Sequence, residues 1–100
     1  MNRDLTPTEG ARFLLERERE DGATAVYKAA IYTPDATFEG VATLNDDGSV
    51  AVDIAAPAEA TEMLTMVARL TARAAAKKRA DGLPPWPPRV LRWKGPGRGE

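Results

Sequence analysis

Apolar residues recur at steps of three and four from residue 57 to residue 81, which places them on one face of a helix. The apolar face comprises Ala60, Met63, Leu64, Val67, Leu70, Ala74 and Ala75. The opposite face carries three basic residues, Arg69, Arg73 and Lys77. No other segment is long and periodic enough to cover a sheet. The pattern therefore predicts one long amphipathic helix around which the fold is organised.

A second helix is predicted over residues 7–20. Thr6 can cap its start, Pro7 suits the first helical position, and Glu9 can close a capping box. Gly22 can end the helix because glycine adopts positive φ without strain. The apolar stripe of this segment is short, so we expect it to pack at the edge of the core; it consists of Ala11, Leu14 and Leu15, with Phe13 at its margin.

Three runs rich in β-branched and aromatic residues follow, and they predict strands at about 24–33, 37–44 and 49–55. Residues 45–49 fit a hairpin loop with a type I turn and Gly48 in the left-handed conformation. This turn puts the apolar residues of both strands on one face. The expected pairs are Leu44 with Val50, Ala42 with Val52, and Gly40 with Ile54.

Residues 33–36 form the turn of the preceding hairpin. Pairing Ile31 with Phe38 keeps Lys28 outside, whereas a shift by one residue would bury it. The residues expected to face inward are Ala25, Tyr27, Ala29 and Ile31. The outward face carries a small apolar patch among polar residues, namely Val26, Lys28, Tyr32, Thr37, Glu39, Val41, Thr43, Ala51 and Asp53.

These elements predict a single α+β domain over residues 1–82, in the order helix, three antiparallel strands, helix (αβββα), with both helices on one face of the sheet. The long helix, about 25 residues or roughly 37 Å, exceeds a strand of about eight residues, roughly 27 Å. Its second part, from residue 71 to residue 81, is therefore expected to overhang the sheet.

Residues 83–100 form a tail rich in Pro, Trp and Arg. Residues 84–88 should be extended as polyproline II, because four of the five are proline. Residues 90–93 could add a short edge strand or lie on the overhanging helix. The last six residues are expected to be disordered.

Composition narrows the possible functions. The 100 residues include no cysteine and no histidine, which excludes disulfides, the usual zinc sites and catalysis by Ser-His or Cys-His pairs. The first residues lack the apolar run of a signal peptide or a membrane span, so we expect a cytoplasmic protein without a membrane partner. The net charge of −1 divides into −8 over residues 1–68 (5 basic, 13 acidic) and +7 over residues 69–100 (9 basic, 2 acidic).

No group of residues predicts catalysis. Residues 45–48 resemble a calcium loop in composition, but Thr43 and Ile54 would occupy its first and last ligand positions. Glu39 and Asp53 point outward on neighbouring strands, without a pocket that would make them an acid and base pair. We therefore expect a chain that is not an enzyme and has no metal or cofactor.

Two binding functions remain, and the same residues are candidates for both: Arg69, Arg73, Lys77, Trp86, Arg89, Arg92 and Trp93. The leading prediction is a protein interaction module, with a homodimer as one form of it, since residues 84–89 have the P-x-x-P-x-R spacing of ligands for polyproline-binding domains. The alternative is nucleic-acid binding, in which basic residues contact phosphates and tryptophans stack on bases. Alternatively, Trp86 and Trp93 fold back on the long helix, because exposed tryptophans are costly.

The predicted order of elements over residues 7–81 resembles the topology of the double-stranded RNA-binding domain. That family has a basic KKxAK-type segment at the start of its second helix and a GPxH-type loop between its first two strands. The matching positions here are Ala58-Glu59-Ala60-Thr61-Glu62 and Thr33-Pro34-Asp35-Ala36. Because these are acidic or uncharged, the resemblance implies a topology and no RNA-contacting residues.

Overall fold

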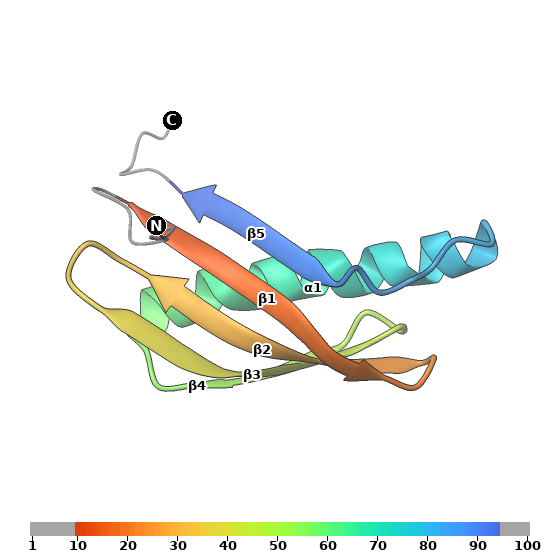
Figure 1. The fold of residues 1–100 in the computed structure, drawn as a ribbon, viewed down its shortest axis with the longest axis horizontal. Helices are drawn as coiled ribbons and strands as arrows, with labels where there is room; N and C mark the ends of the chain where they lie inside the picture. Colours follow the sequence, from red (N-terminus) through yellow and green to blue (C-terminus); the bar gives the residue numbers. More distant parts are fainter. Residues whose placement is uncertain (1–9, 95–100) are drawn as a thin grey trace.

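The computed structural model describes residues 10–94, which form one antiparallel sheet covered on one face by a single helix (Figure 1). The strands lie in the order β4-β3-β2-β1-β5. The elements along the chain are β1 (Ala11–Glu20), β2 (Thr24–Tyr32), β3 (Thr37–Asn45), β4 (Val50–Ile54), α1 (Ala58–Ala80) and β5 (Arg89–Lys94). The predicted α+β class is confirmed, but the predicted αβββα layout is wrong.

The three central strand predictions are confirmed, including their register. Leu44 pairs with Val50 and Gly40 with Ile54 between β3 and β4, while Ile31 pairs with Phe38 between β2 and β3. Gly48 has φ of +95°, as its turn position requires. The four β2 residues expected to face inward are fully buried: Ala25, Tyr27, Ala29 and Ile31.

The first predicted helix is in fact strand β1, which lies inside the sheet between β2 and β5. Phe13 and Leu15 enter the core beneath α1, and Leu14 is only 5% exposed on the opposite face. A run of three apolar residues suits an inner strand, because Leu14 on the face away from α1 lies between Ala30 and Leu91 of the neighbouring strands. The alternation of Arg and Glu over residues 16–20 also has the two-residue period of a strand. The predicted capping residues, Thr6 to Glu9, lie outside the described residues.

The long helix is confirmed as α1, but its buried face differs from the predicted one. The buried residues are Leu64, Ala68, Ala72 and Ala75, whereas Leu70 and Ala74 are exposed. α1 packs mainly on β4 and β3 and less on β1. The helix is also buried further along than predicted, since Ala72 and Ala75 lie within the part expected to overhang.

The chain after α1 returns along the sheet, and residues 89–94 pair with β1 as edge strand β5. Of the two alternatives for residues 90–93, the structure has the edge strand. With β1 and β5 in the sheet, the topology no longer matches the double-stranded RNA-binding domain. No solvent-exposed role is open to Trp86, which is 1% exposed and belongs to the core.

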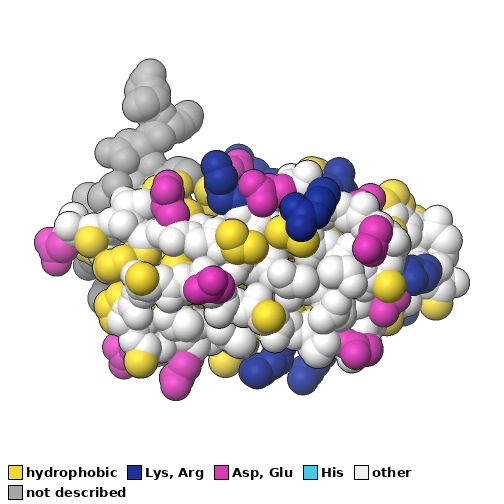
Figure 2. Space-filling view, turned by 90° about the horizontal axis from the view of Figure 1, so that it is seen from below, with side chains coloured by type: hydrophobic (Ala, Val, Ile, Leu, Met, Phe, Trp, Pro, Cys, Tyr) yellow, Lys and Arg dark blue, Asp and Glu magenta, His cyan; other side chains and the backbone are white. Residues whose placement is uncertain are grey.

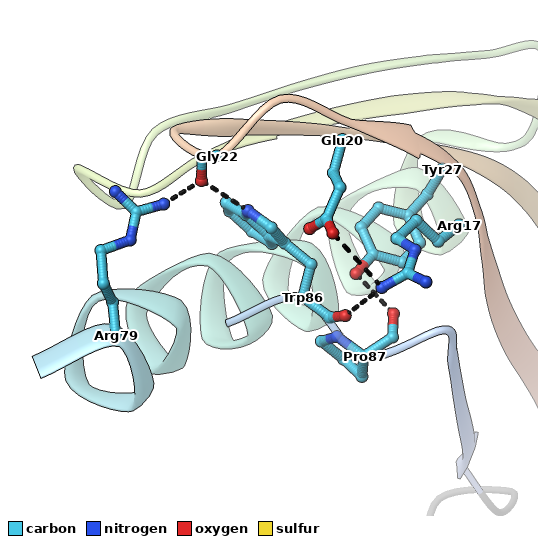
Figure 3. Close-up of polar contacts among 7 residues, drawn as sticks. All are labelled: Arg17, Glu20, Gly22, Tyr27, Arg79, Trp86 and Pro87. Atoms are coloured by element: carbon cyan, nitrogen blue, oxygen red, sulfur yellow. Dashed lines mark hydrogen bonds and ion pairs between the residues drawn. The ribbon is translucent and has the colours of Figure 1, made fainter. Parts of the chain in front are cut away.

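A group of polar contacts holds the segment before β5 against the domain (Figure 3). Trp86 Nε1 donates a hydrogen bond of 2.9 Å to the carbonyl oxygen of Gly22 in the β1–β2 turn, and Arg79 of α1 donates to the same oxygen. Tyr27 donates to the carbonyl oxygen of Pro87 (2.7 Å), and Arg17 donates to that of Trp86 (2.6 Å). These contacts join the turn, the helix and the proline-rich segment, which fixes where β5 begins.

Candidate protein-binding groove

The structure separates the predicted binding residues into two groups. Arg69, Arg73 and Lys77 are exposed on α1. The side chain of Arg73 lies near the β3–β4 hairpin, 3.6 Å from where a Cβ on Gly48 would sit. Arg89, Arg92 and Trp93 lie instead on β5, at the far edge of the sheet from β4. Trp86 belongs to neither group because it is buried.

Acidic residues lie close to the basic end of α1. Arg79 forms an ion pair of 2.7 Å with Asp46 in the β3–β4 hairpin, and Lys77 lies 3.5 Å from Asp81. The surface in Figure 2 likewise shows Lys and Arg side chains interspersed with Asp and Glu, rather than gathered into one basic area. Two of the five basic residues of α1, Lys77 and Arg79, therefore lie beside carboxylates.

An apolar groove lies between α1 and the β1 and β5 strands, and is here called the α1–β5 groove. Its larger part has a volume of about 640 Å³ and extends from Gly10 and Phe13 to Met63 and Met66. A second part of about 320 Å³ continues along α1 past Leu70, with β5 as its other wall. The two parts share Met63 and Met66, so they form one surface along the helix.

The position of α1 explains why this groove exists. One helix is about 10 Å wide, whereas five strands spaced about 4.8 Å apart are wider than one helix can cover. Because α1 packs mainly on β4 and β3, the inner face of β1 and β5 is left beside the helix. Phe13 and Val90 contribute to the groove there, while Met66 and Leu70 are 52% and 58% exposed.

Charged residues mark the two ends of the groove. Glu59 and Glu62 line the end at the start of α1, where Lys94 also lies. Lys78 and Arg92 line the other end. A ligand in this groove would therefore contact apolar side chains along its middle and charged groups at its ends.

The groove lies beside a strand edge. β5 pairs with β1 and ends the order of the sheet that the described residues form. The amide of Arg17 donates to the carbonyl oxygen of Pro88 at 2.9 Å. In an antiparallel ladder the backbone groups alternate, so the N–H and C=O groups of Val90 and Arg92 point toward β1. Those of Arg89 and Leu91 point away from β1, toward the open edge. The guanidinium of Arg92 donates to the carbonyl oxygen of Leu91 at 3.0 Å.

Among the ionisable groups of residues 10–94, two have a shifted pKa, and both have structural roles. Burial raises the pKa of Tyr27 to about 12, and this hydroxyl donates to Pro87. Hydrogen bonds from Ser49 lower the pKa of Asp47 in the β3–β4 turn. Neither lies in the α1–β5 groove. Between residues 10 and 94, His, Cys, Asp and Glu side chains nowhere form a group of three that could hold a metal ion.

Comparison with protein-family models, with curated proteins and with solved structures finds no match. The described part of the chain has no helix that is both long and apolar enough to cross a membrane. The interpretation of the groove therefore rests on its own geometry.

The sequence pattern does not predict the groove. The apolar helix face that it predicts includes Leu70, which is exposed in the groove, and omits Met66. The sequence contains a signal of the groove, because seven of the eleven residues from Ala60 to Leu70 are apolar, which is more than one packing stripe uses. Placing Met66 and Leu70 beside β5 still required knowing that residues 89–94 return as a strand.

Proposed function

We propose that this chain is a non-enzymatic interaction module that binds an extended segment of another protein in the α1–β5 groove. The observation that carries the proposal is the continuous groove beside the edge of β5, with Met66 and Leu70 exposed on its helix wall. An extended segment can hydrogen-bond to a sheet edge while its alternate side chains enter an adjacent pocket. Methionine suits such a surface because its side chain adapts to different partners.

The groove and the edge support each other in this proposal. The backbone groups of Arg89 and Leu91 point toward the position a sixth strand would take. Side chains on one face of that strand would meet Met66 and Leu70. Burial of a leucine-sized side chain contributes about 1.5–3 kcal/mol, and the backbone hydrogen bonds to β5 add to this contribution.

The test compares three versions of the full chain in affinity capture from nuclease-treated lysate of the source cells, read by mass spectrometry. Leu70→Glu places a charge in the groove, and Val41→Glu is the matched control because Val41 is an exposed apolar residue on the outer sheet face. We expect proteins bound by the wild-type chain and by Val41→Glu to be lost with Leu70→Glu. Equal capture by all three chains would contradict the proposal.

Nucleic-acid binding is the competing proposal, and the structure gives it less support. Its basic residues are divided between α1 and β5, and Arg79 and Lys77 lie beside carboxylates. The same three chains can be titrated with a fluorescent 20-nucleotide single-stranded DNA, together with a variant in which Arg69, Arg73 and Lys77 are glutamate. Binding that weakens steeply with salt and is lost only in this last variant would favour nucleic acid.

A further inference from the structure

We infer that the segment bound at the α1–β5 groove is an acidic strand, which adds to the edge of β5 as a sixth strand of the sheet. This inference rests on the proposed function and adds to it the chemistry of the partner. It follows from the charges on β5, from the way β1 already pairs with it, and from the lack of any carboxylate on the β5 strand of a second copy.

β5 is a strongly basic edge strand. Three of its six residues are Arg89, Arg92 and Lys94. Arg92 lines the groove, and Arg89 lies on the opposite face of the sheet. Lys94 lies at the groove end that Glu59 and Glu62 also line, so the positive charge offered to a neighbouring strand comes mainly from Arg89 and Arg92. Opposite charges across neighbouring strands are favourable by about 0.2–1 kcal/mol per pair.

The pairing with β1 shows how β5 accommodates a neighbouring strand. Glu16 lies directly opposite Arg89, while Leu14 lies opposite Leu91 and Leu15 opposite Val90. This neighbour therefore combines apolar residues with a carboxylate opposite Arg89. A sixth strand on the other side of β5 meets the same side chains and is expected to have a similar composition.

A second copy of this chain fits the edge poorly. Antiparallel pairing through the outward-pointing backbone groups of Arg89 and Leu91 puts Leu91 opposite itself and Val90 opposite Arg92. No carboxylate then faces the basic residues, because β5 has none. An acidic segment supplies the opposite charges that a second copy lacks, and basic residues on an edge strand disfavour pairing with a strand of like charge.

Arg92 is the residue that must move for the strand to bind. Its guanidinium donates to the carbonyl oxygen of Leu91, which points toward the incoming strand. An amide of the bound segment would replace this donor, and the released guanidinium would then be available to a carboxylate in the groove. A charge-assisted hydrogen bond of this kind is stronger than one between neutral groups.

The test selects phage-displayed random twelve-residue peptides on the full chain and removes those that also bind Leu70→Glu. The selected peptides are expected to be rich in Asp and Glu with intervening Val, Ile or Leu. The same selection on a chain carrying both Arg89→Glu and Lys94→Glu should yield basic peptides. Circular dichroism shows whether each variant is folded before selection.

Each outcome decides the inference. Acidic peptides whose affinity falls at least tenfold with the two glutamate substitutions would support it. Neutral or basic peptides that still require Leu70 would overturn the acidic partner while leaving the proposed function intact. If no peptide requires Leu70, both fall. If sedimentation instead shows dimers that Leu70→Glu dissociates, the groove binds a second copy and the inference is wrong.

Discussion

Gly40 limits which side chain can stand where β3 and β4 lie close together. A Cβ at this position would lie 2.2 Å from the carbonyl oxygen of Asp53 and 2.7 Å from Cβ of Ile54. Real Cβ atoms do not approach other atoms this closely, and the backbone of β4 would have to move. The absence of a side chain at Gly40 thus lets β4 pack closely against β3.

Gly40→Ala is therefore expected to lower the free energy of unfolding by about 1–3 kcal/mol, the usual cost of overpacking. Urea unfolding followed by circular dichroism measures it. Glu39→Ala is the matched control, because the neighbouring Glu39 side chain is exposed and its loss should change stability by less than about 0.5 kcal/mol. An equal effect of both substitutions would show that β4 is not constrained at Gly40.

Tyr27 predicts a loss of stability in alkaline solution. Burial raises its pKa in the folded protein to about 12, above the ordinary value of 10.0, because the charged form is disfavoured in the core. The stability that the neutral Tyr27 contributes to the folded state is fully present below pH 10 and is lost as the pH rises through 12. The difference in pKa between the folded and unfolded states makes the loss in free energy of unfolding on the order of 2 kcal/mol.

Urea unfolding at pH 8, 10 and 11.5 should show this loss in the wild-type chain and a smaller one in Tyr27→Phe. The variant should also be less stable by about 1 kcal/mol at pH 8, since it lacks the hydrogen bond to Pro87. The same alkaline loss in both chains would assign the effect to other groups.

At the scale of elements, the segments that could be predicted are those whose local signals agree with their tertiary surroundings. Gly48 and the alternation around it determine the register of β3 and β4, and the structure has that register. Thr6, Pro7 and Gly22 flank the segment of β1 and are helix signals in the sequence. The apolar run 13–15 inside that segment is nevertheless buried between two strands. Pairing with β2 and β5 outweighs those signals, and the propensities of single residues contain no information about this pairing.

The proposed binding surface was less predictable than the fold, for a physical reason. Arg89, Arg92 and Trp93 were identified from their composition, but their common place on an edge strand depends on how the chain returns after α1. That return is fixed by contacts between segments far apart in sequence, such as Trp86 with Gly22. Such contacts have no local signature in the sequence.

The two tryptophans provide a test of this view of β5. Trp86 is 1% exposed and anchors the segment before β5, whereas Trp93 on β5 is 56% exposed. Trp86→Ala should cost about 3–5 kcal/mol, as for other buried aromatic residues, and Trp93→Ala less than about 1 kcal/mol. Thermal unfolding of both variants measures the difference. Equal costs would mean that the proline-rich segment does not anchor the strand.

At the scale of the whole molecule, the uneven charge of the sequence is largely redistributed by folding. The acidic β3–β4 hairpin meets the basic end of α1 through Asp46 and Arg79. The basic residues of β5 lie at the other edge of the sheet, beside the apolar groove. The positive charge of residues 69–100 is thus divided in the fold. Arg79 pairs with the β3–β4 hairpin, whereas the basic residues of β5 line the proposed binding edge.

Hydrogen exchange of the β5 amides, read by NMR, tests the central claim most directly. An acidic peptide from the selection, added at one hundred times its Kd, should slow exchange at Arg89 and Leu91 by about a hundredfold. Val90 and Arg92, whose amides already point toward β1, should change little. Binding of the peptide with no added protection at Arg89 and Leu91 would contradict strand addition at the edge of β5.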